Sequence, residues 1–94
     1  MTYKLRPGVE LINVCGTNLL IPSRIASEYC GSLCRLNVIE TIYIQQFMKG
    51  NTLEEVSRVL SKLSRRDPGE MAQEMKKRFD LMAEKGFLIP EDEP

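Results

Sequence analysis

The sequence predicts an α+β domain in which a three-stranded antiparallel sheet precedes a bundle of three helices. Two observations predict this class. Short β-branched and apolar runs around a glycine turn occupy the first third of the chain, and apolar residues at helical spacing fill the remainder. A chain of 94 residues is long enough for one small core. We therefore expect one domain over residues 1–90, followed by an acidic tail at 91–94.

The strands are expected one after another in the first 36 residues. Residues 9–14 are rich in β-branched side chains, and residues 15–17 form a three-residue turn into a second strand at 18–21. Pro22 ends this second strand because proline has no N–H to donate to a sheet. Residues 32–36, with a weaker alternation of apolar side chains, are expected to form the third strand.

Capping residues delimit the first two predicted helices. Asn37 is a typical N-cap for a helix over residues 38–49, and Gly50 ends that helix. Thr52 and Glu55 stand three residues apart, as in a capping box, so a second helix begins there.

The third helix begins at Asp67 and Pro68, because aspartate is a good N-cap and proline suits the first helical position. Gly86 ends it, and residues 87–89 are expected to pack back on the core. The order of elements is typical of a winged-helix layout. Each predicted helix has an apolar stripe that is expected to face the core. The stripes are Ile39, Ile42, Tyr43 and Phe47 in the first helix, Leu53, Val56, Val59, Leu60 and Leu63 in the second, and Met71, Met75, Phe79 and Met82 in the third.

Composition excludes several classes of function. The chain has no histidine, so histidine general-base catalysis and histidine-ligated metal sites are excluded. Thirteen basic residues balance thirteen acidic ones, which argues against a nucleic-acid surface. The N-terminus lacks the apolar core of a signal peptide, and no apolar run approaches the length of a membrane span. We expect a cytoplasmic, non-enzymatic protein without a cofactor and without a membrane partner.

The three cysteines, Cys15, Cys30 and Cys34, are odd in number, which favours free thiols over a disulfide framework. Cys30 and Cys34 have the spacing of a cluster motif, but the position where a third cysteine would complete that motif is Asn37. A tetrahedral zinc site would lack its fourth ligand. We therefore expect no metal, and cysteines that act as small, buried or half-buried apolar residues.

Short motifs along the whole chain together resemble the PqqD family, named after protein D of pyrroloquinoline quinone biosynthesis. The resemblance extends over residues 3–89. Its motifs, in chain order, are Lys4-Leu-Arg-Pro-Gly-Val9, the Gly16 hairpin, Leu36-Asn37, Gly50-x-Thr52-Leu-Glu-Glu-Val56 and Met82-x-x-x-Gly86-Phe-Leu88.

This resemblance implies a recognition element for ribosomally synthesised, post-translationally modified peptides. Members of the family have a winged-helix-like fold and bind the leader segment of a precursor peptide. They present the core of that peptide to a modifying enzyme, often a radical-SAM protein. The leader adds as a further strand beside the third strand, in a groove walled by the third helix.

A physical argument places the peptide-binding residues. A third strand at the border of a sheet has unpaired N–H and C=O groups that an extended peptide can complete. On the third helix, Leu81 is apolar but lies off the core stripe among charged residues. We expect Leu81 to contact an apolar leader side chain, and Arg78 with Lys85 to favour an acidic one. The predicted site comprises Ser32, Leu33, Cys34, Arg35 and Leu36 on the strand and Glu74, Arg78, Leu81 and Lys85 on the helix.

Other interpretations remain open at this point. The second stripe of the third helix is also explained as a solvated face with one exposed leucine. A DNA-binding winged helix shares the architecture, although residues 67–85 carry four basic against five acidic side chains, whereas a recognition helix is normally basic. A third alternative is an adaptor that forms a homodimer through its exposed strand edge.

Overall fold

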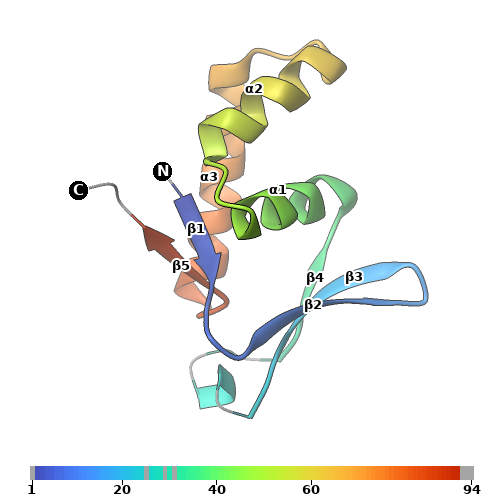
Figure 1. Ribbon diagram of the computed structural model, residues 1–94, viewed down its shortest axis with the longest axis vertical. Coiled ribbons are helices and arrows are strands. Elements are labelled where there is room, and N and C mark those ends of the chain that lie inside the picture. Colours follow the sequence, from blue (N-terminus) through green and yellow to red (C-terminus); the bar gives the residue numbers. More distant parts are fainter. Residues whose placement is uncertain (1, 25, 29, 31, 92–94) are drawn as a thin grey trace.

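The computed structural model describes residues 2–24, 26–28, 30 and 32–91, and it shows two small antiparallel sheets against a bundle of three helices (Figure 1). The predicted α+β class is confirmed. The first sheet has the order β2-β3-β4, and the second pairs β1 with β5. The strands are β1 (Thr2–Leu5), β2 (Val9–Val14), β3 (Thr17–Pro22), β4 (Cys34–Leu36) and β5 (Leu88–Glu91); the helices are α1 (Val38–Met48), α2 (Leu53–Ser64) and α3 (Pro68–Glu84), with a short 3-10 turn at Ala26–Glu28.

The sheet of β1 and β5 was not predicted. Thr2 pairs with Glu91 and Leu5 with Leu88, so the two ends of the described chain lie side by side (Figure 1). The prediction of an acidic tail at residues 91–94 is wrong for Glu91, which belongs to β5; residues 92–94 lie outside the described residues. Pro90 fits into β5 because, among the strands of the described residues, only β1 pairs with β5. The other edge of β5 therefore needs no backbone donor.

The turn between β2 and β3 is tighter than predicted. Val14 pairs with Thr17, so the loop has the two residues Cys15 and Gly16 rather than three. Both have positive φ, 51° and 83°, which is the backbone of a turn that follows the right-handed twist of a hairpin. Cys15 at this turn is exposed, contrary to the prediction of burial, whereas Cys30 is buried; all three cysteines are free.

The helix ends follow the capping residues that the sequence predicts. Asn37 and Thr52 each accept a hydrogen bond from the backbone N–H three residues on, and both complete a capping box. Asp67 caps α3 in the same way, with Pro68 in the first turn. Gly86 has a φ of 92°, and the N–H groups of Gly86 and Phe87 bond back to carbonyls of the last turn of α3. This left-handed closure brings the chain back toward the core.

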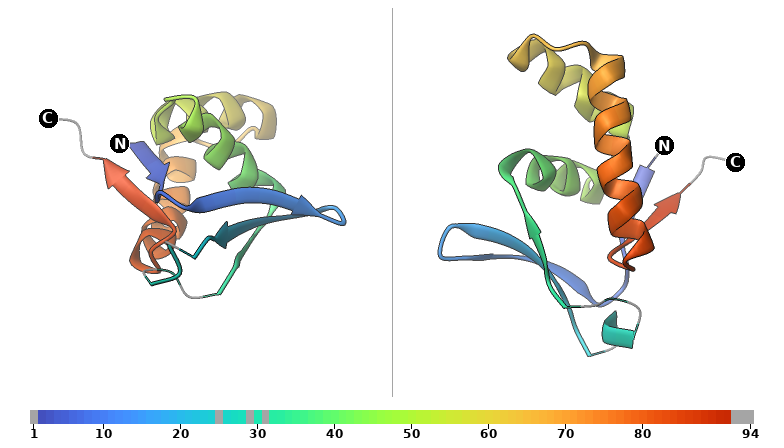
Figure 2. Two further views of the ribbon diagram at one scale, coloured as in Figure 1. Left: turned by 60° about the horizontal axis from the view of Figure 1, so that its bottom comes forward. Right: turned by 180° about the vertical axis from the view of Figure 1, so that it is seen from behind.

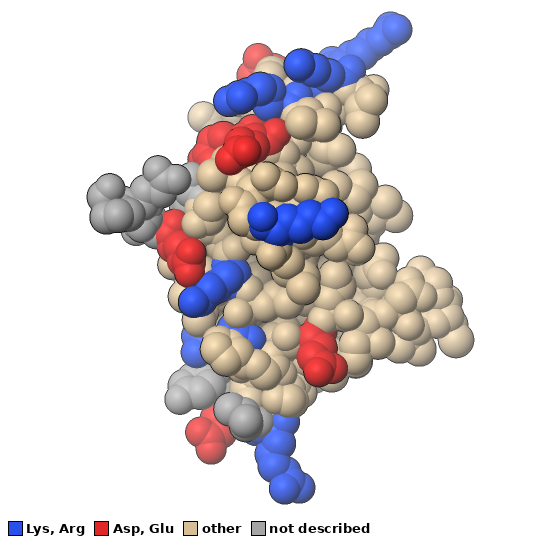
Figure 3. All heavy atoms as spheres, in the orientation of Figure 1, with Lys and Arg blue, Asp and Glu red and all other residues tan. Residues whose placement is uncertain are grey.

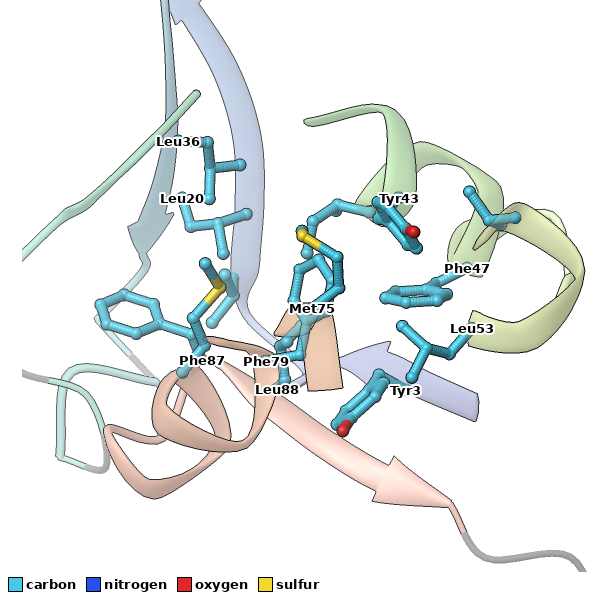
Figure 4. Close-up of a cluster of buried hydrophobic side chains, with 14 of the residues drawn as sticks. Tyr3, Leu20, Leu36, Tyr43, Phe47, Leu53, Met75, Phe79, Phe87 and Leu88 are labelled. Atoms are coloured by element: carbon cyan, nitrogen blue, oxygen red, sulfur yellow. The ribbon is translucent and has the colours of Figure 1, made fainter. Parts of the chain in front are cut away.

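The core contains side chains from both sheets and all three helices (Figure 4). The apolar stripe predicted on α3 is buried throughout. Phe87 and Leu88 are also buried, as predicted for the segment after α3. The centre of the core is a cluster of aromatic rings with centroids 5.2 to 6.0 Å apart, formed by Tyr3, Tyr43, Phe47 and Phe79.

The stripes of the first two helices are only partly buried. In α2, Leu53 and Val56 are buried, but Val59 is 61% exposed and Leu63 is 79% exposed. In α1, Ile39 is exposed as well. The predicted stripe is therefore wider than the surface that the core covers, because α2 contacts its neighbours only along one edge of the stripe. None of the helices in the described part of the chain is long and apolar enough to cross a membrane.

Candidate functional site

Strand β4 forms one border of its sheet. Its three residues pair with β3 on one side, from Leu20 opposite Cys34 to Asn18 opposite Leu36, and no strand of the described chain pairs with the other side. The predicted strand was longer, since Ser32 and Leu33 lie before β4 and are exposed. The free edge of β4 thus offers unpaired backbone groups to an added strand.

The side chains of β4 alternate between the two faces of the sheet. Leu36 is buried in the core, and Cys34 is half-buried on the same face. Arg35 points to the opposite face and is exposed, next to its partner Leu19. A strand added to this edge would have the same alternation. Every second side chain would point to the face of the sheet that the helices cover, called here the helical face.

Helix α3 lies on that helical face. Seen from behind, α3 and β4 are both on the near side of the molecule (Figure 2, right). Leu81 is 56% exposed, so the side chain that the sequence places off the core stripe does face solvent. Lys85, one turn further on, is the C-cap of α3 and is also exposed.

Electrostatic effects connect β4 to both neighbouring helices. Burial raises the pKa of the Cys34 thiol, the nearby carboxylate of Glu40 raises it further, and the ammonium group of Lys85 opposes the rise. Glu40 from α1 and Lys85 from α3 are therefore both close enough to Cys34 to affect its charge. The raised pKa keeps the thiol neutral at pH 7, so Cys34 contributes as a small apolar residue.

Arg78 joins α3 to the first turn of α1. Its guanidinium lies 3.9 Å from the carboxylate of Glu40 and 3.7 Å from that of Glu74. Glu74 also pairs with Arg66 at 2.5 Å, which lowers the pKa of the Glu74 carboxyl. Arg78 and Glu74 are therefore already paired within the chain. Sequence reasoning did not select Glu40, although its position in the Asn37 capping box marks it as a residue next to β4.

Of the nine predicted residues, those near the free edge fall into two groups. Cys34 and Lys85 form one group, because the ammonium group of Lys85 acts on the Cys34 thiol, and Leu81 lies one turn from Lys85 on α3. Glu74 and Arg78 form the other group, in which the two side chains pair with each other. Arg35 faces the other side of the sheet. No group of His, Cys, Asp or Glu residues in the described chain is arranged to hold a metal ion.

Two hollows in the surface lie elsewhere. One, of about 750 Å³, lies between the β2 side of the hairpin and the end of α1, lined by Leu5, Val9, Leu11 and Met48 among others. The other, of about 270 Å³, lies between α1 and α2. Neither includes a residue of the predicted site. The β4 edge is an open surface, which suits an extended chain better than a small molecule.

Comparison with known proteins identifies the fold. No protein-family model and no curated protein matches this sequence. Among solved structures, the chain is similar to lasso peptide synthetase B1 complexed with the leader peptide, with a TM-score of 0.76 and 17% sequence identity. The match covers 96% of this chain and 100% of that one. Over nearly its whole length, the chain has the fold of this peptide-bound protein.

Proposed function

We propose that this protein binds the leader segment of a ribosomally made precursor peptide and presents the peptide to a separate modifying enzyme of the radical-SAM class. The observation that carries the proposal is the free edge of β4. Leu81 and Lys85 are exposed on α3, and the charge of Lys85 acts on Cys34 of β4, which supports their inclusion in the proposed site. The shared fold of a lasso peptide synthetase component complexed with its leader peptide supports it.

Strand addition supplies part of the binding free energy. A three-residue strand offers only a few main-chain hydrogen bonds, each worth about 1 kcal/mol. Association costs about 4 kcal/mol or more. Side-chain contacts therefore have to supply the surplus, and they also decide which peptide is bound.

The spacing on α3 matches the repeat of an extended peptide. Leu81 and Lys85 are four residues apart, which is a rise of about 6 Å along a helix. Every second residue of a strand recurs after about 6.7 Å, so two inward side chains of a peptide along α3 reach both residues. We expect one apolar and one acidic side chain in the leader, separated by a single residue.

Lys85 is the better candidate for recognition of that acidic side chain. Arg78 already lies near Glu40 and Glu74, whereas Lys85 forms no ion pair with the residues that the structure describes. Arg35, on the outer face of the sheet, would meet an outward side chain of the leader instead. The charge preference predicted for Arg78 and Lys85 together therefore rests mainly on Lys85.

A titration of synthetic leader segments tests the proposal. Leu81→Ala removes a side chain whose burial is worth roughly 1.5 kcal/mol or more, so we expect about tenfold weaker binding. Lys85→Glu should weaken binding to an acidic leader by a similar factor. Lys49→Glu is the matched control, because Lys49 is the exposed C-cap of α1 and lies away from β4.

Amide shift mapping of the complex locates the bound peptide. We expect shifts at β4 and at the C-terminal half of α3. Shifts confined to other elements, or equal affinity of the Leu81→Ala and wild-type proteins, would count against this site. Presentation is tested separately, by whether the protein increases turnover of the peptide by a radical-SAM enzyme.

A further inference from the structure

Helix α2 has an apolar stripe that the fold leaves half uncovered. Val56 is buried and Leu60 is partly buried against the core. Val59 and Leu63, one turn apart on the same stripe, are exposed, and Leu63 is the most exposed large hydrophobic residue of the described chain. An amphipathic helix normally directs such a stripe toward a partner.

A hollow of about 270 Å³ lies next to this stripe. Its α2 side is formed by Glu55, Val56, Val59 and Leu60, and its other side by Ile42, Gln46 and Asn51. An apolar cavity of about 150 Å³ already admits a benzene molecule. The hollow is therefore large enough for an inserted leucine side chain.

Charges along α2 are separated by sign. Glu54 and Glu55 lie in the first turn, whereas Lys62 in the last turn is followed by Arg65 and Arg66. Figure 3 shows acidic atoms over the lower end of α2 and basic atoms around its upper end. Two such helices attract each other when they lie antiparallel and repel each other when they lie parallel.

The residues that flank Val59 on α2 are arranged nearly symmetrically before and after it. At about 100° per residue, four positions lie within about 60° of Val59. Glu55 and Lys62 are on one flank, and Val56 and Leu63 are on the other. Each pair has one member before Val59 and one after it, at nearly equal distances.

From this pattern we infer that α2 is the contact surface for a second copy of this chain, with the two helices antiparallel across a two-fold axis at Val59. This axis brings Leu63 of each copy over the hollow beside Val56 of the other. It also places Glu55 of one copy beside Lys62 of the other, offset by about 1.5 Å along the helix. Apolar groups meet on one flank and opposite charges meet on the other.

This inference does not depend on the proposed peptide site. The α2 surface has no residue in common with β4 or with the C-terminal half of α3. One helix from each copy makes a small interface, below the size of about 1,200 Å² typical of stable complexes. The dimer is therefore expected to be weak, and the fraction of chains in the dimer should rise with protein concentration.

Sedimentation equilibrium from low micromolar to low millimolar concentration tests the dimer. The wild-type mass should rise toward twice that of the monomer, and Leu63→Glu should weaken association at least about tenfold, since it places a charge in the apolar flank. Val38→Glu is the matched control, because Val38 is 70% exposed on α1 and outside this surface. It should dimerise like the wild type.

A charge exchange tests the antiparallel arrangement. Lys62→Glu alone brings glutamates together, and Glu55→Lys alone brings lysines together, so each variant should associate more weakly than the wild type. An equimolar mixture of the two restores both opposite-charge pairs and should form heterodimers. Circular dichroism checks that both remain helical, since Glu55 also completes the α2 capping box.

Three results would overturn the inference. The first is a wild-type chain that stays monomeric at every concentration, which would indicate that the exposed stripe of α2 does not bind a second copy of the chain. The second is a dimer that Leu63→Glu leaves intact. The third is a mixture of the charge variants that associates no better than either variant alone.

Discussion

Tyr43 and Ser57 show how single residues hold the helices of this protein together. Both side chains are fully buried, and their hydroxyl oxygens lie 2.6 Å apart across the contact between α1 and α2. Burial raises the pKa of the Tyr43 phenol, while the hydrogen bond with Ser57 acts in the opposite direction. The ring of Tyr43 also packs against Phe47 and Phe79. One residue thus combines apolar packing with a satisfied polar group.

Replacement of Tyr43 by phenylalanine should lower the free energy of unfolding by about 1–2 kcal/mol, because the Ser57 hydroxyl stays buried without its partner. Chemical denaturation measures this loss. The double variant Tyr43→Phe with Ser57→Ala removes both polar groups and should lose less than the sum of the single variants. Additive losses would contradict a direct contact between the two hydroxyls.

Among the elements, the sheet of β1 and β5 packs on α3, and a hydrogen bond from Tyr3 to Asp80 adds a polar contact to that packing. The Tyr3 hydroxyl donates a hydrogen bond of 2.6 Å to Asp80, which also accepts one of 2.8 Å from Lys76. Partial burial by itself raises the pKa of Asp80, but the hydrogen bonds from Lys76 and Tyr3 outweigh it and hold the pKa below its usual value. The ionised form of Asp80 is therefore the one that stabilises this attachment.

The sign of the pH dependence follows from that lowered pKa. Asp80 contributes its full stabilisation above the pKa of an unfolded aspartate, about 3.9, and the contribution is lost as the pH falls through the lower pKa of the folded state. Urea denaturation between pH 2 and 7 should show a smaller decline for Asp80→Asn than for the wild type. Identical pH profiles would contradict a stabilising role for the ionised carboxylate.

Across the molecule, the two proposed surfaces lie on different elements. The peptide surface uses β4 and the C-terminal half of α3, whereas the dimer surface uses α2, which packs on α3. Each surface includes an exposed leucine, Leu81 in the first and Leu63 in the second. The core between them contains the aromatic cluster and is continuous.

Two substitutions should therefore have separable effects. Leu81→Glu should abolish measurable peptide binding and leave the concentration dependence of the mass unchanged. Leu63→Glu should do the reverse, with peptide affinity within about twofold of the wild type. Both assays use the same two proteins, so loss of both properties in one variant would indicate misfolding or a coupled pair of sites.

The elements that depend on local signals could be predicted from the sequence. Capping residues such as Asn37 and Thr52 act within one turn, so the helix starts follow from them directly. The buried stripe of α3, the hairpin and the candidate stripe with Leu81 also follow from spacing along the chain. These features depend on neighbours that are only a few residues away.

The pairings between distant residues could not be predicted from the sequence, because they depend on how the elements pack together. β1 and β5 have four residues each and lie at opposite ends of the described chain, so no local sequence pattern indicates that they pair. The exposure of Leu63, the attachment of Arg78 to Glu40 and the free side of β4 are likewise consequences of which surfaces meet. Periodicity indicates that a helix has an apolar face, but the area that the core can cover sets how much of that face is buried and how much remains for a partner.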